Sequence, residues 1–271
     1  MTAPRILLFD SGMGGLTVAR AVAAQLPDAH LVYAADNAAF PYGDWREAEL
    51  ASRIVHVMGA LLALTRPHIA IVACNAASTV ALAQLREAYS LPFVGTVPAI
   101  KPAAAQTVSG MVGVLATPGT VSREYTRALI DTHARHCEVI LHGAKNLAEM
   151  AERKLQGHGI DHDALRREVA PVFRERDGKR TDVVVLGCTH YPLLLEDIAQ
   201  AAPWPVRYLD PAPAIARRAA DVLAQTPLHN AARKIPAHGT ALFTSSRTTP
   251  ELLASYGAMG FPRHEIVDMP V

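Results

Sequence analysis

Short apolar runs that recur along the whole chain are the feature that most limits its fold. Several of these runs are continuous rather than alternating, which is typical of strands buried on both faces of a parallel sheet. Longer amphipathic stretches lie between them and predict crossover helices. The sequence therefore predicts an α/β fold built on open parallel sheets. The expected strands are 6–9, 31–35, 69–73, 93–94, 112–116, 139–141, 183–186 and 206–208, and the clearest helices are 16–26, 48–64, 78–88 and 123–132.

The pattern occurs twice along the chain. Residues 69–75 read IAIVACN and residues 183–189 read VVVLGCT, so each has four apolar residues, a small residue, a cysteine and a polar residue. The runs 6–9 and 112–115 likewise lead into similar turns. We therefore expect two α/β domains related by an approximate twofold axis. The first is discontinuous, 1–97 plus 210–271, because the last segment is too short for a third domain, and the second is 98–209.

Composition excludes several classes of function. The chain has 26 basic and 25 acidic residues, a net charge of +1, which indicates neither nucleic-acid nor membrane-surface binding. A basic cluster at 166–180 is explained as a solvated helix face and turn. No apolar stretch approaches the length of a membrane span, and the first residues lack the pattern of a signal peptide. We expect a soluble, cytoplasmic protein that acts on a small molecule.

Two of the three cysteines, Cys74 and Cys188, lie at matching places in the two halves. A single cysteine at the end of a buried strand is most often only a small apolar side chain. At the start of a helix, however, the helix dipole stabilises the thiolate, so the group can serve as an acid or base near neutral pH. Cys137 has no such setting and is expected to be structural.

A glycine-rich turn, Asp10-Ser11-Gly12-Met13-Gly14-Gly15, follows the first strand. With Asp36 at the end of the second strand, it suggests a dinucleotide site. The third glycine position of that fingerprint holds Thr17, so this interpretation fails. The turn retains backbone amides at the start of a helix, which suit a small carboxylate. A plain turn without function is the alternative.

Other chemistry with Cys74 and Cys188 remains open at this point. His190, two positions beyond Cys188, could activate it as a nucleophile, and the three residues could bind zinc. No second pair of closely spaced ligands supports zinc, and a hydrolase would need only one of the thiols. Two matching thiols fit a symmetric reaction better, in which one face of a carbon loses a proton and the other face gains one.

Several segments resemble the glutamate racemase family of the aspartate/glutamate racemase superfamily. They span most of the chain in the family's order, and DSGMGGLT and GCTHYPLL are its most specific motifs. The resemblance implies two α/β domains with the active site between them, no metal and no cofactor, and production of D-glutamate from L-glutamate for peptidoglycan synthesis. The segments are FDSGMGGLTV at 9–18, PYGDW at 41–45, VACNAAST at 72–79, VGTVPAIKPA at 94–103, GVLATPGTV at 113–121, VLGCTHYPLL at 185–194 and LDPA at 209–212.

The resemblance also implies the roles of individual residues. Cys74 and Cys188 would be the paired acid and base, with Asp10 assisting the first thiol and His190 the second. Glu152 would be the acidic partner of His190, although it could equally be an exposed helix carboxylate beside basic neighbours. The residues implied to bind substrate are Asp10, Ser11, Tyr42, Gly43, Asn75, Ala76, Thr189 and His190.

The chain departs from the family pattern at Ala76, where the family usually has threonine after Cys-Asn. This departure leaves open a racemase of another amino acid, such as aspartate. A weakly active relative that acts as a binding or regulatory protein is a further alternative. The expected partner is glutamate, with no nucleic acid and no membrane, and a homodimer is left open.

Overall fold

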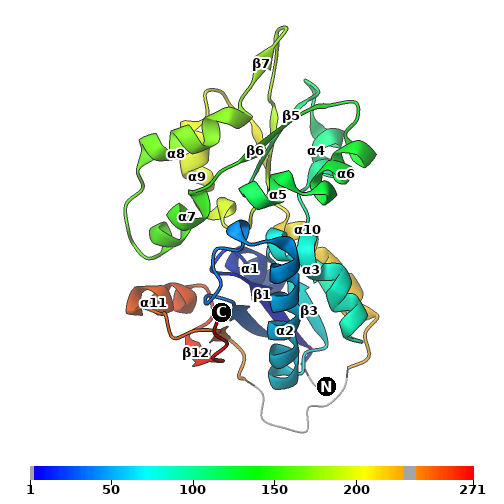
Figure 1. Ribbon diagram of the computed structural model, residues 1–271, viewed down its shortest axis with the longest axis vertical. Coiled ribbons are helices and arrows are strands. Elements are labelled where there is room, and N and C mark those ends of the chain that lie inside the picture. Colours follow the sequence, from blue (N-terminus) through cyan, green and yellow to red (C-terminus); the bar gives the residue numbers. More distant parts are fainter. Residues whose placement is uncertain (1–2, 229–235) are drawn as a thin grey trace. The chain divides into compact units, whose positions relative to one another are not determined.

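The computed structural model describes residues 3–228 and 236–271. The chain divides into two units, Met1–Thr96 with Ala212–Val271 and Val97–Pro211 (Figure 1). Each unit is a parallel sheet with helices packed on it, so the prediction of an α/β fold with parallel sheets in two domains is confirmed.

The first unit contains a six-stranded sheet in the order β12-β11-β2-β1-β3-β4. Every neighbouring pair in it is parallel. The central strands β1 and β3 are buried along their whole length, which explains their continuous apolar sequence. The strands are β1 (Arg5–Asp10), β2 (His30–Ala35), β3 (Ile69–Val72), β4 (Phe93–Gly95), β11 (Thr240–Phe243) and β12 (Arg263–Ile266).

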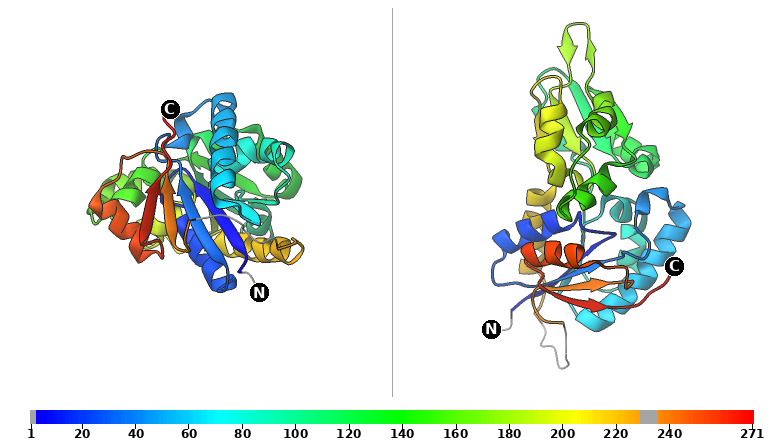
Figure 2. Two further views of the ribbon diagram at one scale, coloured as in Figure 1. Left: turned by 90° about the horizontal axis from the view of Figure 1, so that it is seen from below. Right: turned by 90° about the vertical axis from the view of Figure 1, so that its left-hand side faces the viewer.

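Helices cover both faces of this sheet (Figure 2). Leu7 and Phe9 of β1 belong to the apolar core shared with α2 and α3. Because side chains alternate along a strand, Ile6 and Leu8 lie on the opposite face, where α1 packs against α10. The helices of this unit are α1 (Leu16–Gln25), the 3-10 turn η1 (Tyr42–Asp44), α2 (Glu47–Thr65), α3 (Asn75–Ala88), α10 (Ala212–Ala224) and α11 (Pro250–Ala258).

Helix α2 is long and apolar enough, by length and composition alone, to cross a membrane. It nevertheless packs as a core helix of the first unit. Its buried side chains, among them Leu50, Ile54 and Leu61, lie in the same core as β1 and β3. Its apolar character follows from this packing.

The second unit contains a four-stranded parallel sheet in the order β10-β9-β5-β6. A short antiparallel hairpin, β7 with β8, accounts for part of the basic cluster. The strands are β5 (Met111–Ala116), β6 (Glu138–Gly143), β7 (Glu175–Arg176), β8 (Lys179–Arg180), β9 (Val183–Leu186) and β10 (Arg207–Leu209).

Two apolar cores lie on opposite faces of this second sheet. Val184 and Leu186 pack in one core with α7, α8 and α9, whereas Val183 and Val185 pack in the other with α4 and α6. The helices are α4 (Ile100–Gln106), α5 (Pro118–Ser122), α6 (Glu124–His133), α7 (Leu147–Leu155), α8 (His162–Val169), the 3-10 turns η2 (Ala170–Val172) and η3 (Tyr191–Leu194), and α9 (Leu195–Ala201).

The two units share a strand order. In the first unit β2-β1-β3-β4 are neighbours, and in the second β6-β5-β9-β10 repeat that arrangement. The backbone beyond the third strand also matches, since Ala73 N–H donates to Phe9 O at 2.8 Å and Gly187 N–H donates to Leu115 O at 2.7 Å. A cysteine follows directly in each case. The repeated sequence pattern therefore corresponds to equivalent positions in two similar sheets.

Candidate active site

Cys74 sits at the start of α3, directly beyond β3. It is the N-cap residue of that helix, and its carbonyl accepts the first helical hydrogen bond, from Ser78 N–H at 2.9 Å. Helix α3 begins at Asn75, three residues earlier than the sequence predicted. The thiol is 7% exposed. Its position at the positive end of the helix dipole favours the thiolate form.

Ser11 and Asp10 lie beside this thiol. The Ser11 hydroxyl is 4.0 Å from Cys74 Sγ and 3.4 Å from Asp10 Oδ1. Asp10 is buried at the end of β1, and its carboxylate also accepts the Gly12 N–H at 2.9 Å. The structure thus brings together the carboxylate, hydroxyl and thiol that the sequence predicted as site residues of the first unit.

Two tyrosine hydroxyls bind the glycine-rich turn. The hydroxyls of Tyr33 and Tyr256 both donate to the Gly12 carbonyl, at 2.7 and 3.1 Å. A Cβ atom at Gly15 would lie only 2.7 Å from the Tyr33 hydroxyl oxygen and 3.0 Å from the Asp10 Cβ, so glycine is required there. The close approach of these side chains fixes the backbone that carries Asp10 and Ser11.

Asn75, the first residue of α3, has an unusual environment. Its side chain is 2% exposed, and neither its oxygen nor its nitrogen has a hydrogen-bond partner among the described residues. A buried amide without a partner destabilises a folded protein, so such groups are rare unless something else binds them. Asn75 therefore has the properties of a group that is kept for a ligand, beside Cys74.

Tyr42 and Gly43 form the 3-10 turn η1, which packs against α3. The Tyr42 hydroxyl does not face a ligand: it donates to the carboxylate of Asp36 at 2.6 Å and is buried. Burial and then the charge of Asp36 raise the pKa of Tyr42 well above its usual range. Because the first N–H groups of a 3-10 turn have no acceptor within the turn, the backbone N–H of Gly43 is the candidate donor here.

In the second unit, Cys188, His190 and Glu152 form a connected row. Cys188 Sγ lies 3.7 Å from His190 Nδ1, and His190 Nε2 lies 3.0 Å from Glu152 Oε1. His190 is 3% exposed, and Glu152 comes from α7. The carboxylate that the sequence could not assign is thus the partner of the histidine, rather than an exposed helix charge.

This arrangement favours the protonated form of His190. Burial alone would lower the pKa of the imidazole, but hydrogen bonds to Cys188 and to Glu152 outweigh burial and raise the pKa of His190 well above its usual range. An imidazole within reach of a thiol can exchange a proton with it. The row therefore suits proton transfer through Cys188.

The backbone around Cys188 differs from that around Cys74. Cys188 and Thr189 lie in a turn that leads into the 3-10 turn η3, and Tyr191 N–H donates to the Cys188 carbonyl at 3.1 Å. Gly187 before it has no room for a side chain, since a Cβ atom would be 2.9 Å from that of Ala116. Thr189 occupies the position that Asn75 holds in the first unit and is likewise buried.

The ionisable groups near the two thiols come from different positions in the two units. By strand register, the counterpart of Asp10 in the second unit is Ala116, which ends β5 as Asp10 ends β1. His190, two residues after Cys188, corresponds to Ala76, two residues after Cys74. The nearby carboxylate thus precedes the helix in the first unit, and the imidazole follows the cysteine in the second.

Cys137 differs from the two buried thiols. It is half-buried just before β6, and burial followed by the charge of Asp182 raises the pKa of its thiol. A raised pKa makes a thiol a weaker acid, so this environment suits a structural role. Among residues 3–228 and 236–271, no group of three or more histidine, cysteine or acidic side chains is arranged to hold a metal ion.

Comparison with known proteins places this geometry. The model of the Asp/Glu/Hydantoin racemase family matches residues 16–219. The chain belongs to this racemase family. A glutamate racemase of Sinorhizobium medicae is 51% identical over 93% of each chain, and one of Brucella suis is 56% identical over 80% of this chain and 79% of its own.

Solved racemase structures share the fold. The crystal structure of Escherichia coli glutamate racemase, in complex with L-glutamate and the activator UDP-MurNAc-Ala, has a TM-score of 0.90 and 42% sequence identity, and the match covers 98% of this chain and 99% of that one. A Bacillus anthracis glutamate racemase isoform, RacE1, has a TM-score of 0.78 at 27% identity. The resemblance inferred from the sequence is confirmed.

Proposed function

We propose that this racemase interconverts L- and D-glutamate by proton transfer between Cys74 and Cys188. The observation that carries the proposal is the matching placement of the two buried thiols, each one residue beyond the same backbone hydrogen bond in two similar sheets. Each thiol also lies near a second group that can accept or hold a proton, Ser11 with Asp10 in one unit and His190 in the other. The similarity to glutamate racemases at 50–56% identity supports glutamate as the substrate.

The proton balance is simple. A thiolate removes the α-proton from one face of glutamate, which leaves two electrons on the α-carbon, and the thiol of the other cysteine gives its proton to the opposite face. After one turnover the two cysteines have exchanged protonation states. The reverse reaction restores them, so the reaction consumes no redox equivalent and requires no metal or organic cofactor.

The residues around the thiols have matching duties in this proposal. His190, held by Glu152, stabilises the thiolate of Cys188, and Asp10 provides a negative charge for the substrate ammonium group. The carboxylates of the substrate would be bound by the unpartnered Asn75 amide, Thr189, and backbone N–H groups at Ser11 and Gly43. Ala76, small and buried, directly follows Asn75 and would lie near the substrate in this proposal.

The proposal also places the enzyme in the cell. D-Glutamate is needed for peptidoglycan, so we propose that the reaction supplies cell-wall synthesis in the cytoplasm. The near balance of charge supports a small-molecule substrate, with no nucleic-acid or membrane partner. A homodimer is proposed as the assembly to test, by light scattering of the purified protein.

The test is to add pure L-glutamate to the protein in deuterated water that contains a chelator and no pyridoxal phosphate. We expect the D/L ratio to approach one, because the two isomers have equal free energies, with deuterium at the α-carbon of the product. An inactive preparation that regains activity with zinc would overturn the thiol mechanism. An inactive preparation under all conditions would favour a binding or regulatory protein.

Aspartate is the second candidate substrate, and Ala76 is the observation that favours it, because a methyl group replaces the usual hydroxyl. The same assay with aspartate, glutamine and alanine decides between substrates. If the pocket binds a distal carboxylate through Asn75 and Gly43, glutamate should react at least tenfold faster in kcat/KM than glutamine or alanine. A higher kcat/KM for aspartate than for glutamate would reassign the substrate.

A further inference from the structure

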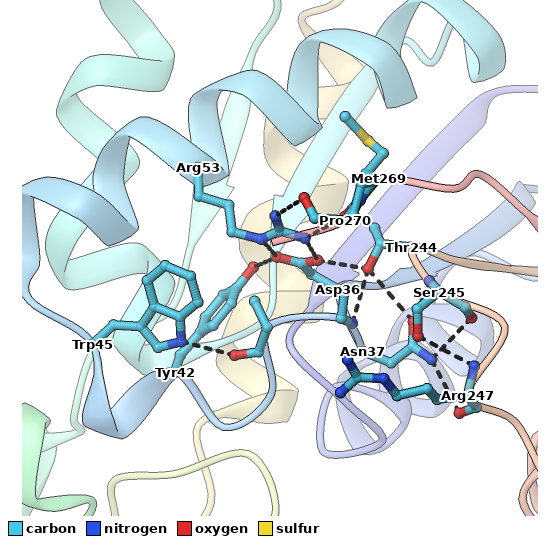
Figure 3. Close-up of polar contacts among 12 residues, drawn as sticks. Asp36, Asn37, Tyr42, Trp45, Arg53, Thr244, Ser245, Arg247, Met269 and Pro270 are labelled. Atoms are coloured by element: carbon cyan, nitrogen blue, oxygen red, sulfur yellow. Dashed lines mark hydrogen bonds and ion pairs between the residues drawn. The ribbon is translucent and has the colours of Figure 1, made fainter.

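Asp36 is the centre of a buried polar cluster at the end of β2 (Figure 3). Its side chain is fully buried, and four donors reach its two oxygens. Tyr42 Oη and Arg53 Nε donate to Oδ2 at 2.6 and 2.8 Å, and Arg53 Nη2 and Thr244 Oγ1 donate to Oδ1 at 2.6 Å each. Its own N–H donates to the Asp10 carbonyl at 2.9 Å. The cluster is therefore attached to the carboxyl-terminal end of the sheet, where Asp10 and Cys74 also lie.

Arg53 is the cation of this cluster. Its guanidinium binds both carboxylate oxygens of Asp36, with the side chains only 10% and 0% exposed. Two further N–H groups of Arg53 donate to the carbonyls of Met269 and Pro270, at 2.9 and 3.1 Å. The hydrogen bond to Asp36 raises the pKa of Arg53. A two-pronged pair of this kind fixes distance and orientation together.

The cluster joins five segments of the chain. The end of β2, the turn η1 through Tyr42 and helix α2 through Arg53 are near one another in sequence, whereas Thr244, beyond β11, and residues 269–270, beyond β12, come from the end of the chain. Figure 3 shows the side chains of Tyr42, Arg53 and Thr244 converging on the carboxylate of Asp36, with the Met269 and Pro270 carbonyls bound to Arg53. No catalytic role in the proposed reaction requires this charge pair.

What the cluster holds in place is the turn that carries Gly43. The Tyr42 ring lies in the same apolar core as Cys74 and Ala76, and its hydroxyl ends on Asp36. Trp45, at the other end of η1, donates from its indole N–H to the Ala39 carbonyl at 3.0 Å. The turn is thus tied at both ends, with the Gly43 backbone between the two ties.

We propose that Asp36 and Arg53 are positioning residues that fix the Tyr42–Gly43 turn for binding of the substrate carboxylate. The inference rests on the proposed function, because it assigns a purpose to the turn in that reaction. If the turn is less well fixed, it binds the substrate carboxylate more weakly, and by the same amount in the enzyme–substrate complex and in the transition state. Such weaker binding raises KM and leaves kcat nearly unchanged.

The test compares Arg53→Lys with a matched control, Arg86→Lys. Lysine keeps the charge at 53 but cannot bind both oxygens of Asp36 in the same geometry. Arg86 donates to the Phe93 carbonyl at 3.1 Å from helix α3 and does not contact the turn. We expect KM for glutamate to rise at least tenfold in Arg53→Lys with kcat lowered less than threefold, and both constants to change less than twofold in the control.

A second variant, Tyr42→Phe, keeps the Asp36–Arg53 pair and removes only the tie to the turn. It should also raise KM, by about threefold or more. In the double variant the rise in KM should be smaller than the product of the two single-variant rises, because both substitutions act through the same turn. If Arg53→Lys does not fold, Tyr42→Phe decides alone. Unchanged KM in every folded variant, with an active wild type, overturns the proposal.

Hydrogen exchange measured by mass spectrometry on residues 37–46 provides a readout that does not depend on activity. Exchange there should be faster in Arg53→Lys and Tyr42→Phe than in Arg86→Lys. Faster exchange without a change in KM would show that the cluster is only structural and overturn the proposal. If the wild type fails to racemise glutamate, the proposed function fails. In that case, exchange of residues 37–46 that is no faster in Arg53→Lys and Tyr42→Phe than in Arg86→Lys would separately show that the cluster does not hold the turn.

Discussion

Replacing Asn75 by leucine should make the protein more stable while it prevents substrate binding. The amide is 2% exposed and has no hydrogen-bond partner among the described residues. An unpaired polar group in this position costs about 1–3 kcal/mol of folding free energy. Leucine has a similar shape and a better helix propensity. We therefore expect Asn75→Leu to gain about 1–3 kcal/mol, which corresponds to a rise of about 2–12 °C in Tm for a protein of this size.

The assay is urea denaturation of both proteins with and without glutamate. Ligand at about 100 times its Kd should stabilise the wild type by about 2.7 kcal/mol, and the leucine variant by much less. The matched control is Ser78→Ala on the same helix. The Ser78 hydroxyl donates to the Val72 carbonyl at 2.9 Å and accepts the Thr96 N–H at 3.0 Å, so its loss should destabilise the protein by about 1–3 kcal/mol.

A loss of stability in Asn75→Leu, instead of a gain, would refute the reasoning. If Asn75→Leu were less stable than the wild type by more than about 1 kcal/mol, the amide would have to be satisfied in the free protein, for example by an ordered water molecule. Asn75 would then be a structural residue like Ser78. Full retention of glutamate binding in Asn75→Leu would contradict its role in the site directly.

The remaining predictions concern the acid and base groups. Cys74→Ser and Cys188→Ser should each abolish net racemisation, because serine is a far poorer base near neutral pH. Cys74→Ser should still exchange the α-proton of L-glutamate slowly with deuterated water, and Cys188→Ser should exchange only the α-proton of D-glutamate. Full racemisation by either variant would refute the two-thiol mechanism. Cys137→Ser, the control, should stay active. Because the pKa of His190 is raised in the folded protein, the stability that it contributes is complete below about pH 6.5 and is lost as the pH rises through the raised value. Glu152→Gln should accordingly lower the free energy of unfolding by about 1–2 kcal/mol at pH 6, because a charged acceptor is replaced by a neutral one, and by less in alkaline solution. Urea denaturation of both proteins from pH 5.5 to about 10 tests this. A loss of unfolding free energy that does not change with pH would contradict the prediction.

The sequence predicted the strands that are buried on both faces, since a short continuous apolar run between turn residues is typical of such strands. It did not predict β12, which reads RHEI and is exposed along its length, because an edge strand need not be apolar. The strand β11 is buried, yet its four residues are too few to stand out from a helix or loop. The two-residue strands β7 and β8 carry only charged side chains, so their pairing depends on the turn between them.

In the candidate site, residues that directly follow a predicted strand could be located from the sequence. Cys74 and Cys188 could be placed because each follows a predicted strand directly. Glu152 could not be assigned, since it is 38 residues from His190 and the packing of α7 alone brings them together. The role of Asp36 was also missed. Its sequence position suggested only a partner for a nucleotide ribose, and its true partner, Arg53, is on a helix whose pattern indicates burial but not contacts.

The discontinuous first unit has a consequence during protein synthesis. Strands β1 to β4 leave the ribosome early, but β11, which covers the outer edge of β2, follows only after the whole second unit. At about 5–20 residues per second, the chain from Thr96 to Phe243 takes roughly 7–30 s to make. Throughout that interval the β2 edge, with its apolar LVYAA sequence, is an open template for pairing with another nascent chain. Slower translation should therefore favour aggregation of this protein, whereas the contiguous second unit completes its own sheet before release.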